Sequence, residues 1–355
     1  MDKTPIRNTR PVTLKEVASV AGVSVNTASR ALRDMSDIGK DTKIHVRDIA
    51  DALGYRKNTA AVRLKTNHSQ RIGVIVSDIA NPFFGGMVKG IERICRAHGF
   101  GVMLANASID PNEEISCIYD FSDCGVDGIL FVPCVREYND CQRVLDIFER
   151  LKLPYLLTAA RYDGYETSYV MSDDVLGGYL AAQHLYELGH RKFALLFQNI
   201  STSPVRGRIQ GFKQLLSEKG LSPDKCIRMS DWDGDFMNTQ AAMRSILSGV
   251  RDYTALFCYC DYFAMSAYAA IYEAGLRIPE DLSVMGYDNI ELCNAMSPSL
   301  STISISHEKL GEVAALKLLE IIRSPYPELE IQHKIVLKPF LVPRNSTAAI
   351  RTDTH

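Results

Sequence analysis

The feature that most constrains the fold of this chain is a series of short, unbroken apolar runs separated by segments of helical length. The first four runs are Ile72–Val76, Gly101–Leu104, Gly128–Val132 and Tyr155–Leu157, and after about residue 173 three more follow at Phe193–Phe197, Ala255–Tyr259 and Leu282–Gly286. Unbroken apolar strands joined by helical crossovers are typical of parallel sheets that are covered on both faces. The two series predict an α/β core of two lobes, each built on a doubly wound parallel sheet. Ligands of such sheets bind at the carboxyl ends of the strands, so we expect the pocket in the cleft between the lobes.

The segment before this core shows a helical pattern instead. Thr13–Glu16 has the form of a capping box, which predicts the start of a first helix, and Gly22 permits the chain to turn after it. A second helix is expected over Ser24–Arg33, with its first residue as the N-cap, and a third over about Thr42–Leu53, ending at Gly54. The apolar side chains at helical spacing, which we expect to form a small core, are Leu14, Val17, Ala18, Ala21, Ala28, Ala31, Leu32, Val46, Ile49 and Leu53.

Two short helices joined by a tight turn predict a helix-turn-helix, which binds DNA by inserting the start of its second helix into the major groove. Asn26 can pair with adenine through two hydrogen bonds, Arg30 can pair with guanine, and Val25 can touch a thymine methyl group. The hydroxyl groups that can donate to phosphates belong to Thr13, Ser24, Thr27 and Ser29. A plain three-helix bundle without a partner is the alternative that these residues leave open.

The distribution of charge favours the DNA-binding interpretation. Residues 1–71 contain 14 Lys and Arg against 7 Asp and Glu, whereas the remainder of the chain contains 26 against 35. A basic segment attached to an acidic body is typical of a nucleic-acid-binding domain joined to a second unit. A basic arm that is merely solvated is the alternative.

The signals of several other protein classes are missing from the sequence. Neither G-x-G-x-x-G after the first strand, nor G-x-x-x-x-G-K-[ST], H-E-x-x-H or G-x-S-x-G occurs, so we expect neither a cofactor nor an enzyme. The nine cysteines form no C-x-x-C motif, which predicts reduced thiols and no metal site. The polar start MDKTPIRNTRP is unlike a secretory peptide, and no apolar stretch reaches the ~18–20 residues of a membrane-spanning helix. We therefore expect a cytoplasmic protein that does not enter a membrane.

Longer motifs make the chain similar to a known family. VTLKEVASVAGVSVNTASRAL at residues 12–32 is followed by Gly54-Tyr55 and by NTAAVRL at residues 58–64. Further motifs are Ile72–Asp78 with NPFF at 81–84, YCD at 259–261 with Ala264, GYDN at 286–289, and SLSTI at 299–303 with Gly311. These residues resemble the lactose-repressor (LacI/GalR) family of transcription regulators, and the resemblance extends from about Val12 to Arg344.

The resemblance implies a hinge that folds into a short helix only on operator DNA, near residues 58–65. In the dimer, Leu64 of each subunit would wedge into the minor groove at the centre of the operator. The positions expected to contact DNA in this segment are Asn58, Ala61 and Leu64. Two positions depart from the family pattern, since Lys57 stands where proline is usual and Val62 stands where arginine is frequent.

The strand ends and the resemblance together predict the residues that bind a small-molecule effector. Aromatic rings suit the C–H faces of a sugar, and carboxylates and arginine suit its hydroxyl groups. The expected effector-binding residues are Asp78, Phe83, Phe84, Asp173, Arg208, Trp232, Asp261 and Asp288. Ser172 or Asp174 could take the place of Asp173. Asp261 is favoured because it ends an apolar strand and has no Lys or Arg among its near sequence neighbours to occupy its carboxylate.

These inferences combine into one expected organisation. A helix-turn-helix headpiece occupies residues 1–56, a hinge 57–70, an effector-binding and dimerisation core like that of periplasmic binding proteins 71–343, and a polar tail 344–355. Within the core, the N-lobe comprises about 71–173 and 300–325, and the C-lobe about 174–299 and 326–343. We expect a homodimer that binds palindromic operator DNA and represses transcription under the control of a sugar or sugar derivative. A solute-binding protein with the same core is the alternative.

Overall fold

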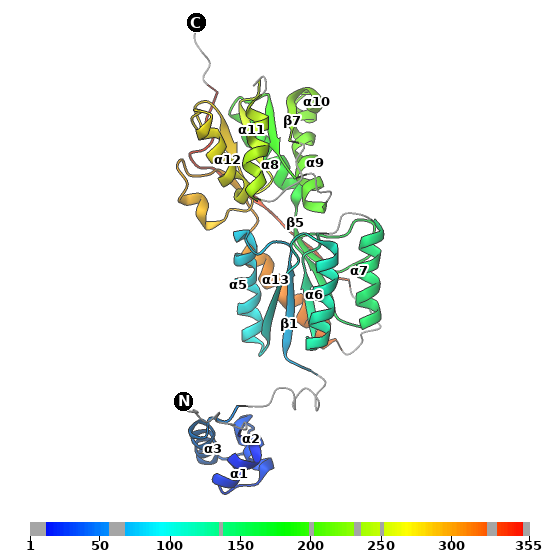
Figure 1. The fold of residues 1–355 in the computed structure, drawn as a ribbon, viewed down its shortest axis with the longest axis vertical. Coiled ribbons are helices and arrows are strands. Elements are labelled where there is room, and N and C mark those ends of the chain that lie inside the picture. Colours follow the sequence, from blue (N-terminus) through cyan, green and yellow to red (C-terminus); the bar gives the residue numbers. More distant parts are fainter. Residues whose placement is uncertain are drawn as a thin grey trace, which may run out of the picture. The chain divides into compact units, whose positions relative to one another are not determined.

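The chain forms two separate compact units. The computed structural model describes residues 12–56, 68–134, 138–198, 202–230, 236–248, 252–324 and 332–350. Its contacts divide the chain into Met1–Ser69, the unit that contains the headpiece, and Gln70–His355, the unit that contains the core. The core itself has two lobes, each built around its own sheet (Figure 1).

The headpiece is the predicted bundle of three short helices, α1 (Leu14–Val20), α2 (Val25–Leu32) and α3 (Lys40–Ala52). The capping box at Thr13 is confirmed, because its hydroxyl accepts from the Glu16 amide while the Glu16 carboxylate accepts from the Thr13 amide. The third helix begins two residues earlier than the sequence predicted, after Gly39. The most deeply buried side chains of the bundle are Val17, Ala18, Ala28, Ala31, Val46 and Ala50.

The N-lobe is a six-stranded parallel sheet between two pairs of helices, in the strand order β11-β5-β4-β3-β1-β2. Its strands are β1 (Arg71–Val76), β2 (Gly101–Asn106), β3 (Gly128–Phe131), β4 (Tyr155–Thr158), β5 (Tyr169–Ser172) and β11 (Lys334–Leu337). Its helices are α5 (Pro82–Ala97), α6 (Pro111–Cys124), α7 (Tyr138–Leu151) and α13 (His307–Arg323). Helices α5 and α13 cover one face of the sheet, and α6 and α7 cover the other (Figure 1).

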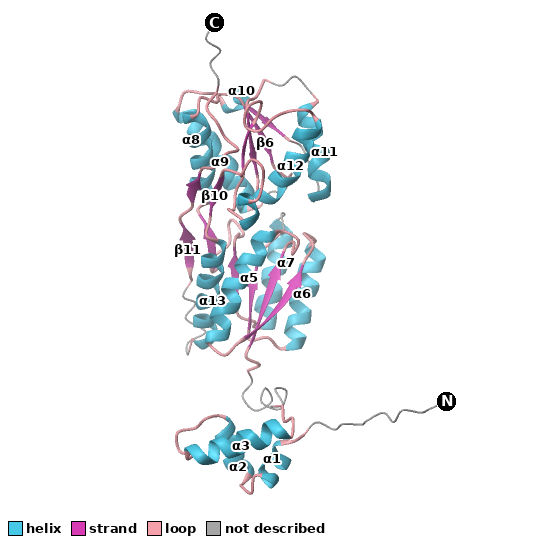
Figure 2. Ribbon diagram, turned by 90° about the vertical axis from the view of Figure 1, so that its left-hand side faces the viewer, coloured by secondary structure: helices cyan, strands magenta, loops and turns pink. Residues whose placement is uncertain are grey.

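The C-lobe repeats this architecture with a four-stranded parallel sheet in the order β7-β6-β8-β9. Its strands are β6 (Phe193–Leu196), β7 (Ile227–Met229), β8 (Ala255–Cys258) and β9 (Ser283–Met285). Its helices are α8 (Asp174–Glu187), α9 (Ser203–Glu218), α10 (Pro223–Cys226), α11 (Phe236–Leu247) and α12 (Asp261–Glu273), followed by the 3-10 turn η1 (Glu291–Asn294). Figure 2 shows α8 and α9 on one side of this sheet and α11 and α12 on the other. In the described ranges, no helix combines the length and apolarity needed to cross a bilayer.

The end of the chain joins the lobes differently from the sequence-based expectation. Strand β11 pairs with β5 and so belongs to the N-lobe, which corrects the assignment of all of 326–343 to the C-lobe. Strands β10 (Thr302–Ser304) and β12 (Phe340–Val342) form a separate antiparallel pair. The described part of the expected polar tail packs against the C-lobe, because Ser346 is fully buried and exchanges hydrogen bonds with Val284.

Helices α5 and α13 approach each other backbone to backbone. A Cβ atom added at Gly90 would lie 2.1 Å from the carbonyl oxygen of Glu308, and one added at Gly311 would lie 2.1 Å from that of Met87. Backbone atoms cannot move aside as a flexible side chain does, so glycine is required at both contacts.

We predict that Gly90→Ala destabilises the core by about 1–3 kcal/mol because the new methyl group overpacks the contact with α13. Gly85→Ala, the matched control on α5, should be neutral or should stabilise the core by up to about 1 kcal/mol, because its Cβ would have nothing within 4 Å and alanine favours helix. Urea unfolding of both variants measures the difference. Equal shifts of the unfolding midpoint would contradict this account of the contact.

Candidate functional site

The headpiece exposes the start of α2 in the way that major-groove recognition requires. Ser24 caps this helix and accepts a hydrogen bond from the Thr27 amide at 3.0 Å. Because Ala28 and Ala31 turn into the bundle, the opposite face carries Val25, which is 46% exposed, and the exposed Asn26. The first turn of α2 therefore presents one apolar and one amide side chain to solvent.

Arg30, the third predicted base-reading residue, is already engaged within the headpiece. Its guanidinium forms an ion pair with Asp37 in the loop before α3, and its side chain is 37% exposed. The hydrogen bond from Arg30 holds the pKa of the Asp37 carboxyl below its usual value. The ion pair restricts the conformations of the Arg30 side chain in the absence of DNA.

The predicted phosphate contacts stay predictions. Thr13 donates its hydroxyl to Glu16 at 2.9 Å, and the hydroxyls of Ser24 and Thr27 lie 2.8 Å apart in one hydrogen bond. Ser29 is half-buried on the same helix. The hinge positions Asn58, Ala61 and Leu64 lie outside the described residues.

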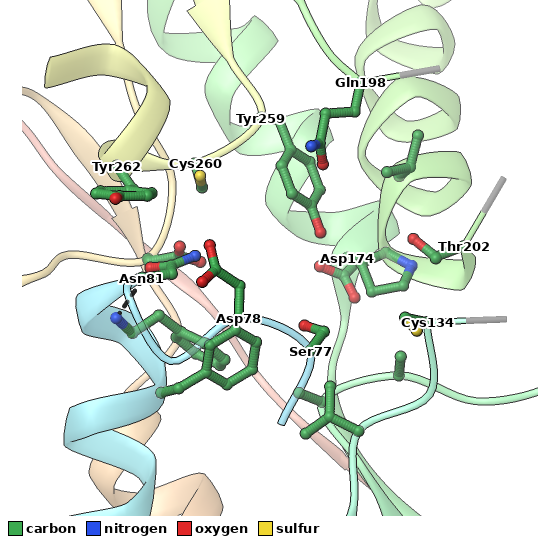
Figure 3. Close-up of a pocket in the computed structure, with 18 of the residues that line it drawn as sticks. Ser77, Asp78, Asn81, Cys134, Asp174, Gln198, Thr202, Tyr259, Cys260 and Tyr262 are labelled. Atoms are coloured by element: carbon green, nitrogen blue, oxygen red, sulfur yellow. Dashed lines mark hydrogen bonds between the residues drawn. The ribbon is translucent and has the colours of Figure 1, made fainter. Parts of the chain in front are cut away.

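A cavity lies where the strands of both lobes end. From the N-lobe it is lined by residues that follow β1, β3 and β5, and from the C-lobe by residues that follow β6, β8 and β9. Figure 3 shows Ser77, Asp78 and Asn81 of the N-lobe on the opposite side of this cavity from Gln198, Tyr259 and Tyr262 of the C-lobe. The predicted location of the pocket between the lobes is therefore confirmed in the structure.

The structure brings five of the eight predicted effector residues to the cavity, namely Asp78, Phe83, Phe84, Arg208 and Asp288. Asp173 is not among the lining residues, because its carboxylate caps α8 by accepting from the Leu176 amide at 2.9 Å. Its neighbours Ser172 and Asp174, the two alternatives for that place, both line the cavity. Trp232 lies outside the described residues.

Arg208 is the centre of the polar part of the cavity. Only 5% of the residue is exposed, and its Nε donates to Asp174 Oδ1 at 2.9 Å while Nη1 donates to the Tyr259 carbonyl at 2.5 Å. Its Nη2 lies 3.8 Å from Asp288 Oδ1. The guanidinium also lies over two rings, with its carbon 3.6 Å from the ring centre of Tyr287 and 4.6 Å from that of Tyr259.

The two carboxylates that face Arg208 are held in a poorly solvated environment. Burial raises the pKa of Asp174, although the charge of Arg208 opposes this shift. Burial likewise raises the pKa of Asp288 well above its usual value, and the neighbouring Asp261 and Asp174 add to the shift while Arg208 opposes it. Burial thus disfavours the charged form of both groups, and hydrogen bonds donated by a ligand would stabilise that charged form.

Asp261 was expected to bind the effector, and the structure corrects that expectation. Its carboxylate is fully buried, accepts from the Thr302 hydroxyl at 2.6 Å and from the Ile290 amide at 3.0 Å, and is not among the cavity-lining residues. Burial raises its pKa to about 6, against the opposing effect of the Thr302 hydrogen bond. Asp261 does not end the strand, because β8 stops at Cys258 and Asp261 is the first residue of α12; its carboxylate supports the turn that follows β9.

That turn, residues 286–290, carries Asp288 into the cavity in an unusual conformation. Asp288 and Asn289 have φ angles of 115° and 60°, which non-glycine residues rarely adopt. Arg344 anchors the turn from the other side, since its guanidinium donates to Asn289 Oδ1 at 2.7 Å, to the Leu300 carbonyl at 2.8 Å and to Asn294 Oδ1 at 2.9 Å. Asp261 and Arg344 together hold Asp288 and Asn289 in this conformation, which brings the Asp288 carboxylate to the cavity.

Sequence reasoning did not predict three of the aromatic residues that line the cavity. Tyr259, Tyr262 and Phe263 line the cavity from the end of β8 and the first turn of α12. The signal was present, because these residues flank Asp261 directly after an apolar strand. An aromatic residue at a strand end is equally common in a core, so the pattern alone did not distinguish the two roles.

Glu114 is a buried carboxyl group behind the cavity wall. It is 0% exposed, and its Oε1 accepts from the amide of Cys134, a lining residue, at 2.6 Å. Its Oε2 and the buried Tyr162 hydroxyl have no hydrogen-bond partner among the described residues. Burial raises the pKa of Glu114 to about 7, despite the opposing hydrogen bond from Cys134.

We predict that Glu114→Gln changes how the stability of the core depends on pH. Because the folded pKa is about 7 and the ordinary value is 4.5, the folded state binds a proton that the unfolded state lacks between these values. Wild-type stability should therefore fall as pH rises through this window, and the variant should gain up to about 3 kcal/mol relative to wild type from pH 4.5 to pH 8. Denaturant unfolding across this range measures it. The exposed neighbour Glu113→Gln is the control, and a Glu114→Gln difference that stays constant with pH would contradict the assignment.

Two family models match the chain. The model described as bacterial regulatory proteins of the lacI family matches residues 13–58, and the periplasmic binding protein-like domain matches residues 182–347. The ribose operon repressor of Haemophilus influenzae is 32% identical over 342 residues, which cover 96% of this chain and 99% of that protein. The transcriptional repressor PurR of Aliivibrio salmonicida is 32% identical over 338 residues, with 94% and 98% covered.

Solved structures of similar regulators also match the chain. The lac repressor dimer bound to operator and an anti-inducer matches with a TM-score of 0.82 at 26% identity, covering 96% of this chain and 100% of that chain. A LacI family regulator of Enterococcus faecium with bound ribose matches with a TM-score of 0.70 at 31% identity, covering 79% and 100%. With a relative above 30% identity across almost its whole length, the chain belongs to the lacI family of bacterial regulatory proteins.

Proposed function

We propose that this protein is a transcription repressor whose binding to operator DNA is controlled by a sugar or sugar derivative in the interlobe cavity. The observation that carries the proposal is the presence in one chain of a helix-turn-helix with an exposed recognition surface and a ligand-sized cavity between two lobes. Relatives that match almost the whole chain are named as repressors. The protein would act in the cytoplasm, where operator DNA is found.

The recognition surface suits base edges in the major groove. Asn26 offers an amide that pairs with adenine, and Arg30 offers a planar fork that pairs with the N7 and O6 acceptors of guanine. Because the Asp37 carboxylate is paired with Arg30 in the free headpiece, guanine would take the place of that carboxylate as the acceptor.

We propose that the protein works as a homodimer on a palindromic operator. One recognition helix contacts too few base pairs to specify a genomic site, so two headpieces must read two half-sites. The lac repressor, which matches this chain over 96% of its length, is described as a dimer on its operator.

The cavity has the size and chemistry for a small sugar. Its volume is about 100 Å³, and its lining combines the rings of Tyr259 and Tyr262 with the carboxylates of Asp78 and Asp288. A ligand between the lobes that favours one lobe arrangement would shift the protein toward it, and the hinge at residues 57–70 would transmit the change to the headpieces.

Gel shift and fluorescence anisotropy with candidate operators test the proposal directly. The protein should bind one palindromic sequence at least about a thousandfold more tightly than random DNA at physiological salt. A panel of pentoses and hexoses should contain a member that both raises the Tm and alters operator affinity. Binding of a sugar with no effect on DNA, or no preference for any operator, would favour the solute-binding alternative.

We predict that Arg30→Ala removes the preference for operator while weak, salt-sensitive binding to DNA persists, because one good base contact discriminates by about 1–3 kcal/mol. Arg33→Ala is the matched control, since Arg33 lies exposed at the end of the same helix. It should weaken binding to operator and random DNA by similar factors. An Arg30→Ala protein with an undiminished ratio of the two affinities would refute the base contact.

We predict that Arg344→Met weakens sugar binding about tenfold or more without changing operator affinity in the absence of sugar, because Asp288 loses the anchored turn that presents it. Titration calorimetry with the sugar identified above measures the loss. Arg277→Met is the control, as Arg277 also makes several hydrogen bonds in the C-lobe but is paired with Asp281 away from the cavity. Equal sugar affinities of the two variants would mean that Arg344 has no positioning role.

A further inference from the structure

We infer that the cavity selects polyhydroxylated ligands without negative charge and rejects sugar phosphates and sugar acids. The inference rests on the proposed function, since it concerns the ligand of the same cavity, and it adds the charge class of that ligand. Three carboxylates line the described part of the cavity, from Asp78, Asp174 and Asp288. The only Lys, Arg or His among the lining residues that the structure describes is Arg208.

The net charge of the three carboxylates and Arg208 cannot become positive while Asp78 is ionised. With all three carboxylates ionised they outnumber the guanidinium by two. Even if Asp174 and Asp288 both carried protons, Asp78 and Arg208 would only cancel. An anionic ligand would meet no surplus of positive charge.

Arg208 is also largely committed to the protein. It donates to Asp174 and to the Tyr259 carbonyl, and its face lies against Tyr287 at 3.6 Å. A phosphate-binding arginine typically offers two parallel N–H groups to the anion. Here the Nε that would complete such a fork is bonded to Asp174 instead. The remaining Nη protons suit single acceptors such as ligand hydroxyls.

The carboxylates require a ligand that donates hydrogen bonds. Asp174 is 3% exposed, and its Oδ2 has no hydrogen-bond partner among the described residues although it belongs to a cavity-lining side chain. A hydroxyl or amine of a ligand can satisfy such an acceptor, whereas an ionised phosphate or carboxylate has only acceptors to offer. A buried oxygen without a partner is therefore an observation, separate from the charge count, that favours a donor-rich ligand.

Helix N-termini at the cavity offer an anion few free amides. The positive ends of helices attract anions, and α5, α8, α9 and α12 all begin at the cavity. Asn81 accepts from the first-turn amide of Phe83 in α5, and Asp173 accepts from the Leu176 amide in α8. The starts of α9 and α12 have no side-chain cap in the described part of the chain, but Pro204 removes one amide from α9 and the Asp261 amide of α12 donates to the Tyr287 carbonyl. The protein itself thus occupies or removes several amides that an anionic ligand would use.

The test compares each sugar with its charged derivatives. The probes are pentoses and hexoses, their terminal phosphate esters, and the 2-amino-2-deoxy hexoses, measured by titration calorimetry with the full chain. For a parent sugar that binds, we expect the phosphate ester to bind at least tenfold more weakly, and the amino sugar to bind within tenfold of the parent. A phosphate ester that binds as tightly as its parent, or more tightly, would overturn the inference.

Asp78→Asn tests whether negative charge in the cavity is the cause of the weaker binding expected for phosphate esters. Asp78 Oδ1 accepts from the Ala80 amide at 3.0 Å, and asparagine retains that acceptor. The variant should reduce the ratio of affinities for the parent sugar and its phosphate ester about tenfold, whereas Asp120→Asn, an exposed change on α6, should leave this ratio unchanged. An affinity ratio that Asp78→Asn does not reduce would also overturn the inference.

The operator assay separates this inference from the proposed function. If a sugar phosphate binds the cavity as tightly as its parent sugar and alters operator affinity, the inference fails and the proposed repressor stands. If a neutral sugar binds with the expected preference but has no effect on DNA, the inference stands and the proposed control of DNA binding fails.

Discussion

A positive charge is buried in the C-lobe, and much of the cavity is arranged around it. Arg208 is contacted by two carboxylates, one backbone carbonyl and two tyrosine rings, which come from the start of α8 and from the segments that follow β8 and β9. A Cβ atom at Gly178 would lie 2.0 Å from the Arg208 carbonyl, so the close approach of α8 and α9 sets where this side chain begins. Because an unpaired buried charge is costly, Asp174, Asp288 and the two rings depend on one another.

The second constraint is the turn that presents Asp288. Two successive residues with positive φ angles need support from outside the turn, and here Asp261 supplies it through the Ile290 amide and Arg344 through the Asn289 side chain. The unusual backbone therefore lies at the ligand cavity, and the groups that fix it lie one layer further away. Asp261, the first residue of α12, can thus support the site without lining it.

The sequence was sufficient for the features that extend over many residues or rest on local hydrogen bonds. The seven apolar runs became strands, and the caps at Thr13 and Ser24 formed as expected. Strands β5, β7, β10, β11 and β12 were not predicted, and the pairing of β11 with β5 depends on contacts across more than a hundred residues, which no local pattern reveals. The prediction of the site missed by a single position at Asp173, because Asp173 and Asp174 are neighbours in sequence and only Asp174 lines the cavity.

The path of the chain between the lobes has a consequence for the order in which the protein folds on the ribosome. The headpiece is continuous in sequence, so it can complete its core early in translation. The N-lobe must wait for α13 and β11, and the C-lobe must wait for the segment around Ser346 that pairs with β9. Neither lobe can close until residues beyond 330 have emerged, so a nascent chain would possess a folded DNA-reading domain well before the part that controls it.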